Sequence, residues 1–110
     1  MTPQSEANRL FPILLSRAKA MEDQYGKPEI IPISIYETDN DLEVLRPEDK
    51  GIWTAKFHRE TMEIIASKLQ AEGYNAVSKP LDAAAYLRWL AETKNKNTPE
   101  NRAQFIQLQF

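Results

Sequence analysis

The only histidine of the chain stands in His58-Arg59-Glu60, a spacing that also occurs in zinc deaminases. That zinc site needs two cysteines as well, and this chain has no cysteine and no second histidine. We therefore expect no metal site and no cofactor. Imidazole titrates near neutral pH, so a small enzyme that uses His58 as a general base is our third hypothesis. We favour a packed or capping histidine, because His58 lies beside the apolar stripe of an expected helix.

A short acidic segment, Asp39-Asn40-Asp41-Leu42-Glu43, begins like a calcium-binding loop. Such a loop has glycine at its sixth position and glutamate at its twelfth, where this chain has Val44 and Lys50. We interpret the segment as a solvated turn. The sequence, with only 3 glycines, also contains no glycine-rich phosphate loop and no serine-nucleophile motif. Because these catalytic patterns are missing, we expect a protein that is not an enzyme.

Basic and aromatic residues are interleaved in the second half of the chain, which suits single-stranded nucleic acid. The whole chain has a net charge of −2 and a pI of about 5.4, whereas nucleic-acid domains are usually basic. Nucleic-acid binding is therefore our alternative function rather than our first. Its candidate residues are Lys56, Arg59, Lys79, Arg88, Lys94 and Lys96.

Apolar residues near the end of the chain suggest a surface for a protein partner. Trp89 lies off the stripe that we expect Ala84, Leu87, Leu90 and Ala91 to bury. The last helix either packs on Trp89 or docks on another molecule. We favour a non-enzymatic protein-interaction or regulatory module, which binds an unknown protein or a second copy of itself. The candidate contact residues are Trp89, Arg102, Phe105, Ile106 and Phe110.

The strongest periodic pattern lies between Trp53 and Trp89. A helix is expected to begin after Thr54, a good N-cap, and to end at Gly73, which tolerates a left-handed backbone. Residues 74–78 alternate and predict a strand. Two further helices follow, one capped by Asp82 and one beginning at Thr98-Pro99.

The first half predicts a helix that begins at Thr2-Pro3, contains the unfavourable Pro12 and ends before Gly26. Pro12 either kinks this helix or separates two helices. Residues 29–37 predict a strand, placed at a sheet edge by Pro32. We expect a turn at residues 38–41 and a short return strand at 42–45, which together make a hairpin.

These elements predict an α+β fold, with a small two- or three-stranded sheet that includes a hairpin and about four helices mostly on one face. The alternative is a largely helical domain with one hairpin attached. A chain of 110 residues is expected to form a single domain over residues 1–110. No apolar run is long enough to span a bilayer, and no signal peptide is apparent, so we expect no membrane association. The absence of cysteine is compatible with the cytoplasm, where we expect the protein.

Overall fold

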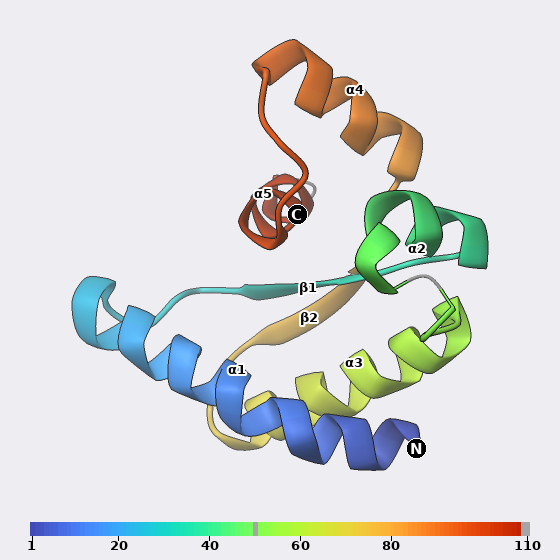
Figure 1. Cartoon of the computed structure of the whole chain (residues 1–110). Helices are drawn as coiled ribbons and strands as arrows, with labels where there is room; N and C mark the ends of the chain where they lie inside the picture. Colours follow the sequence, from blue (N-terminus) through green and yellow to red (C-terminus); the bar gives the residue numbers. More distant parts are fainter. Residues whose placement is uncertain (50, 109–110) are drawn as a thin grey trace.

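Five α-helices, a single 3-10 turn and two short strands make up the described part of the chain, residues 1–49 and 51–108 of the computed structural model (Figure 1). In chain order the elements are α1 (Pro3–Tyr25), β1 (Ile31–Ile35), α2 (Asp39–Leu45), the 3-10 turn η1 (Pro47–Asp49), α3 (Ala55–Ala71), β2 (Ala76–Pro80), α4 (Ala83–Thr93) and α5 (Pro99–Gln107).

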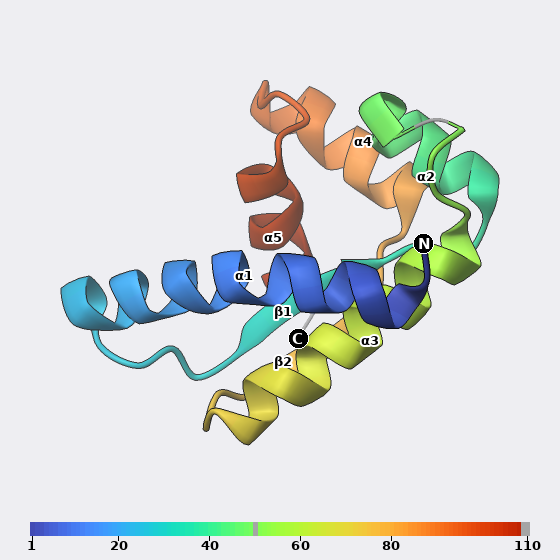
Figure 2. The same cartoon turned by 60° about the horizontal axis from the view of Figure 1, so that its bottom comes forward.

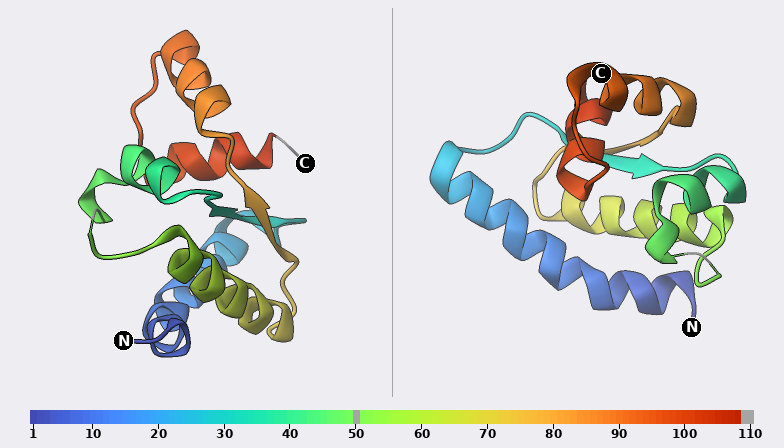
Figure 3. Two further views of the ribbon diagram at one scale, coloured as in Figure 1. Left: turned by 90° about the vertical axis from the view of Figure 1, so that its right-hand side faces the viewer. Right: turned by 45° about the horizontal axis from the view of Figure 1, so that its top comes forward.

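The two strands form a parallel sheet in which Ile31 pairs with Ala76 and Ile35 with Pro80. Between them the chain crosses over through α2 and α3. One face of the sheet is covered by α3, with α1 packed against it, while α5 lies on the other face, over β1, with α4 beyond it (Figures 1 and 3). The fold is therefore α+β, as expected, but its helices cover both faces rather than mostly one.

The expected hairpin is wrong, because residues 39–45 form the helix α2 and the two strands run parallel. Thr38 begins this helix, since its hydroxyl accepts a 3.1 Å hydrogen bond from the Asp41 N–H. A strand would place Leu42 and Val44 on one face. Instead Leu42 and Leu45, three positions apart, are buried, whereas Val44 is 48% exposed. The helix is therefore favoured, because it places both leucines on its buried face.

Helix boundaries agree closely with the sequence. Thr54, Asp82 and Thr98 each accept a hydrogen bond from an N–H of the first turn that follows. Gly73 has φ of 93° after the last turn of α3, a conformation that costs glycine little. α1 is a single helix that contains Pro12, so the alternative of two separate helices is wrong.

Buried side chains form two clusters, one on each face of the sheet. The α3 core lies between the sheet and the pair α1 and α3, and the α5 core lies on the other face. The α3 core consists of Ala7, Ile65, Ala66, Leu69, Tyr74 and Ala76. The α5 core consists of Tyr36, Leu42, Leu45, Ala55, Leu81, Tyr86, Leu90, Phe105 and Ile106.

The stripe expected to be buried on α4 is correct for Leu90 but wrong for Ala84, Leu87 and Ala91, which are exposed. Tyr86 is fully buried and Leu90 is 9% exposed, whereas Leu87 is 44% exposed. The helix therefore turns Tyr86 and Leu90 inward, and the tyrosine ring contributes a large apolar area to the core. Within the described residues, no helix is both long enough and apolar enough to cross a membrane.

Candidate interaction surface

The outer edge of β2 carries backbone groups that the sheet does not use. Two hydrogen bonds of 2.9 Å fix the register of the strands: the Ile31 N–H donates to the Asn75 carbonyl, and the Leu81 N–H donates to the Ile35 carbonyl. Along each strand of a parallel pair, residues whose backbone groups point at the partner strand alternate with residues whose groups point away from it. Ala76, Ser78 and Pro80 are therefore the positions of β2 whose backbone groups point away from β1.

The two ends of this edge are already closed. Ala76 is fully buried, and its carbonyl accepts a 2.8 Å hydrogen bond from the side-chain amide of Gln70 in α3. Pro80 has no N–H to donate. Ser78, between them, is half-buried and offers both an N–H and a C=O. Another strand can therefore pair with β2 at Ser78.

A hollow of about 340 Å³ runs along this edge, between β2 and the outer face of α3. An adjoining hollow shares Glu63 and Ser67 with it and extends to Pro3 at the start of α1. We call the first hollow the edge groove, and it is lined by Glu63, Ala66, Ser67, Gln70, Asn75, Ala76, Val77 and Ser78. An extended chain placed here would lie beside the unused groups of Ser78.

The edge of the sheet formed by β1 is less suited to a further strand. Pro32 occupies an outward position within this strand and so removes a donor. Past the end of the strand, the Tyr36 carbonyl accepts a 3.4 Å hydrogen bond from the guanidinium of Arg59. Proline is one of the usual means by which proteins protect an edge strand. Of the two edges, β2 is the more open to pairing.

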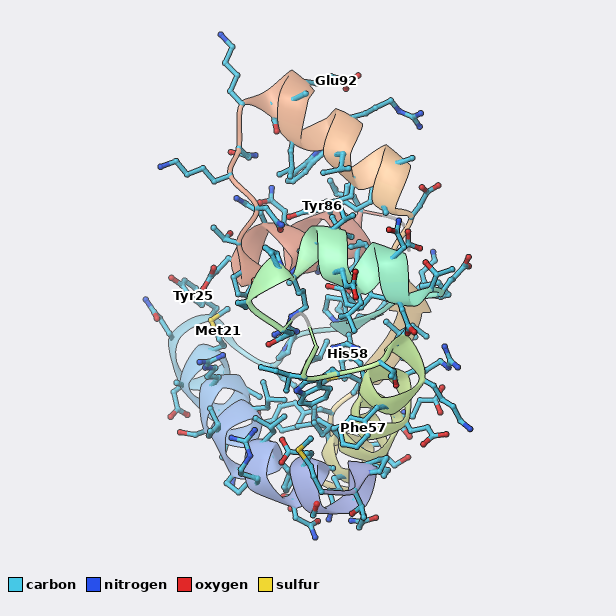
Figure 4. All side chains as sticks on the ribbon, turned by 45° about the vertical axis from the view of Figure 1, so that its right-hand side comes forward. Met21, Tyr25, Phe57, His58, Tyr86 and Glu92 are labelled. Atoms are coloured by element: carbon cyan, nitrogen blue, oxygen red, sulfur yellow. The ribbon has the colours of Figure 1, made fainter. Side chains whose placement is uncertain are left out.

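The C-terminal end of α1 is a second uncovered surface. Leu14, Ala18, Met21 and Tyr25 lie on one side of this helix, at spacings of three and four residues. Leu14 and Ala18 pack on the α3 core, but Met21 is 54% exposed and Tyr25 is 71% exposed. This half of α1 extends past α3 in Figure 2, and Figure 4 marks both side chains at its end.

Phe105 and Ile106, two of the five residues expected to contact a partner, belong to the α5 core, and Trp89 packs against it. The rings of Trp89 and Phe105 are 5.5 Å apart, Phe105 is 5% exposed and Ile106 is fully buried. The last helix thus packs on Trp89 within the same chain, the first of the two alternatives. Phe110 lies outside the described residues. That these residues bind a partner stays a prediction, and the burial of Phe105 and Ile106 leaves little of those two side chains to contact one.

Arg102 is 5% exposed and connects three segments of the α5 side. Its Nη1 donates to the Leu45 carbonyl at 3.0 Å and to Oδ1 of Asn97 at 2.7 Å. Asn97 also accepts a 3.0 Å bond from the Tyr86 hydroxyl and donates to the Leu45 carbonyl at 2.7 Å. These contacts join the C-terminus of α2 to α4 and α5. The sequence placed Arg102 on the correct side of its helix but did not predict this network.

His58 is packed, as favoured, with only 2% of its surface exposed. The Tyr36 and Trp53 rings lie 5.2 and 5.6 Å from it, and Nε2 lies 3.5 Å from the Arg46 guanidinium. Burial, with the charges of Arg46 and Arg102, lowers the pKa of His58 to about 3. With Nε2 accepting from Arg46, the proton sits on Nδ1, which has no hydrogen-bond partner among the described residues. An imidazole of such low pKa is a weak base at neutral pH.

The basic residues of the nucleic-acid alternative are spread over four parts of the fold. Lys56 and Arg59 belong to α3, on one side of the sheet, and Lys79 belongs to β2. Arg88 and the connector that carries Lys94 and Lys96 lie on the other side (Figure 1). Nucleic-acid binding stays a prediction, but the six residues do not share one face of one element.

Sequence reasoning missed the edge groove entirely, because it rests on a parallel pairing that joins residues 31–35 with 76–80. Pro32 and Pro80 were the available signals, since each marks a strand position without a ladder N–H. The chain matches no protein-family model, and no curated protein is similar enough to count as a relative.

Proposed function

We propose that the protein is a non-enzymatic protein-interaction module that binds an extended chain along the outer edge of β2. The observation that supports this is the edge groove, into which the N–H and C=O of Ser78 are directed. In this mode of recognition, main-chain hydrogen bonds provide affinity and alternate side chains provide specificity. Glu63 and Ser67 of α3, which line the groove, are available to contact the side chains of a bound strand.

The cytoplasm is the compartment that we propose for this module, on the basis of its cysteine-free sequence. Microscopy of the tagged chain in its native cell tests this placement. Export of the chain from the cytoplasm would contradict it.

A proline substitution tests the proposed edge. Ser78→Pro removes an N–H that the β1–β2 ladder does not use, and Ser34→Pro is the matched control on β1. Both strands already carry a proline at an outward position, Pro32 and Pro80, so each substitution has a precedent in its own strand. Circular dichroism of both variants should give the spectrum of the folded wild type.

Affinity purification from the native cell, quantified by mass spectrometry, measures the loss of partners. We expect Ser78→Pro to recover fewer bound proteins than Ser34→Pro, and we expect amide exchange of residues 75–79 to slow in the bound wild type. Equal recovery by the two variants would exclude the β2 edge as the binding surface.

A further inference from the structure

We infer that the strand that pairs with β2 comes from a second copy of this chain. The two β2 strands run antiparallel about a two-fold axis that passes between their Ser78 residues. This inference rests on the proposed function, because it fills the same edge groove. It joins the two small sheets into one sheet with the order β1-β2-β2-β1.

The outward groups of β2 are self-complementary in this register. In an antiparallel pair, facing residues whose backbone groups point at the partner strand exchange two hydrogen bonds. Ser78 is such a residue, so each Ser78 donates to and accepts from Ser78 of the second copy. Two positions away, Ala76 faces Pro80 of the second copy. Pro80 brings no donor of its own, so it does not compete with Gln70 for the Ala76 carbonyl.

The bond between Gln70 and Ala76 favours this partner over an unrelated strand. A strand with an N–H opposite the Ala76 carbonyl would have to share or displace the Gln70 amide, which already donates to that oxygen at 2.8 Å. A donor left without an acceptor in a buried strand pair weakens that pair. A proline at that position avoids this weakening, and the second copy supplies one.

Side chains and symmetry also agree with the pairing. Val77 faces Lys79 of the second copy and Ala76 faces Pro80, so no like charges lie directly opposite one another. The small side chains of Ala76 and Ser78 allow the two backbones to approach. A two-fold interface uses the same surface on both copies and therefore closes at the dimer. Pro32 on the remaining edge opposes further strand addition.

Sedimentation of the whole chain over a range of concentrations measures the association. We expect the wild type to pass from 12.7 kDa to twice that mass as its concentration rises. Ser78→Asp places two carboxylates opposite one another at the axis and should shift the transition to concentrations more than about tenfold higher. Ser34→Asp, the control on β1, should leave the transition in place.

A single introduced cysteine locates the axis, because the chain contains no cysteine of its own. Hydrogen-bonded antiparallel partners have Cα atoms about 5.5 Å apart, a distance that a disulfide can span. Ser78→Cys should therefore give a disulfide-linked dimer under mild oxidation, and Ser34→Cys should not.

A wild type that stays monomeric at every concentration would overturn self-pairing, as would a dimer that Ser78→Cys fails to cross-link. If the monomer still loses its cellular partners on Ser78→Pro, the proposed function stands and only the identity of the strand is wrong. If Ser78→Pro and Ser34→Pro recover partners equally, the proposed function fails as well.

Discussion

The two faces of the sheet are closed by different kinds of contact. On the α5 side, the Tyr86 and Phe105 rings lie 5.3 Å apart and Trp89 covers both. On the α3 side, α1 contributes mainly half-buried aliphatic residues, and its last turns are exposed. The face filled by rings leaves little surface for a partner, whereas the face covered by α3 and α1 leaves both the edge groove and the end of α1 open.

Polar groups follow the same division. The α5 side buries Arg102 and its bonds to Leu45 and Asn97, and it encloses His58. The α3 side buries Glu6 and Thr61, which bond within their own helices. Its bond between α1 and residue 74 lies at the rim, where the Tyr74 hydroxyl donates to Glu22 at 2.6 Å. That bond raises the pKa of Tyr74 to about 12. Changes on the α5 side should therefore affect stability more strongly.

Lowering the pH should produce the largest change in the free energy of unfolding. The folded pKa of His58 is about 3, below its ordinary value of 6.5, so the unfolded chain binds a proton more readily in the interval between them. The stability that follows is fully present above about pH 6.5 and is lost as the pH falls towards about 3. At about 1.36 kcal/mol for each pH unit, the loss is about 2 kcal/mol by pH 5 and about 5 kcal/mol over the whole interval.

Denaturant unfolding at several pH values measures this dependence, with His58→Gln as the variant that lacks it. The difference in the free energy of unfolding between wild type and His58→Gln should become smaller as the pH falls. Parallel curves for the two proteins would show that His58 is not the group responsible.

Phe105→Ala should have the next largest effect, about 4 kcal/mol, because it opens a cavity among the rings of the α5 core. Phe11→Ala is the matched control on the other face, where the ring is only half-buried, and should cost about 1–2 kcal/mol. Urea unfolding of both variants compares the two faces directly. Equal losses of unfolding free energy in the two variants would contradict the difference in packing between the two faces of the sheet.

Arg102→Met keeps much of the side-chain volume but removes both charge-assisted hydrogen bonds of Nη1. We expect a loss of about 2 kcal/mol. The charge of Arg102 also helps to lower the pKa of His58, so that pKa should rise in the variant. Titration of the imidazole by NMR measures the change. An unchanged pKa together with unchanged stability would mean that the network does not act as described.

Tyr25→Ser should change stability least, by less than about 0.5 kcal/mol, because the side chain is 71% exposed at the uncovered end of α1. Thermal unfolding measures this effect. A clearly lower melting temperature would show that this end of α1 is covered in solution, by this chain or by another copy.

Local signals in the sequence predicted the helix ends and the packing of His58. A cap such as Thr54 or Asp82 acts through hydrogen bonds to residues within the next turn, so its effect can be read from neighbouring residues alone. The position of His58 beside Ile65 on one helix face is equally local. These features depend little on the rest of the fold.

By itself, the sequence therefore determined that capped helices dominate an α+β chain. Only the tertiary structure decided that residues 42–45 are helical and that β1 pairs with β2 in parallel, 45 positions apart in the register of Ile31 and Ala76. The outward direction of Ser78 follows from that pairing. The burial of Leu42 and Leu45 and the bond of Arg102 to Leu45 follow from the packing of α2 in the α5 core. They could not be read from local pattern because contacts between distant segments, rather than local propensity, select among conformations of similar intrinsic energy.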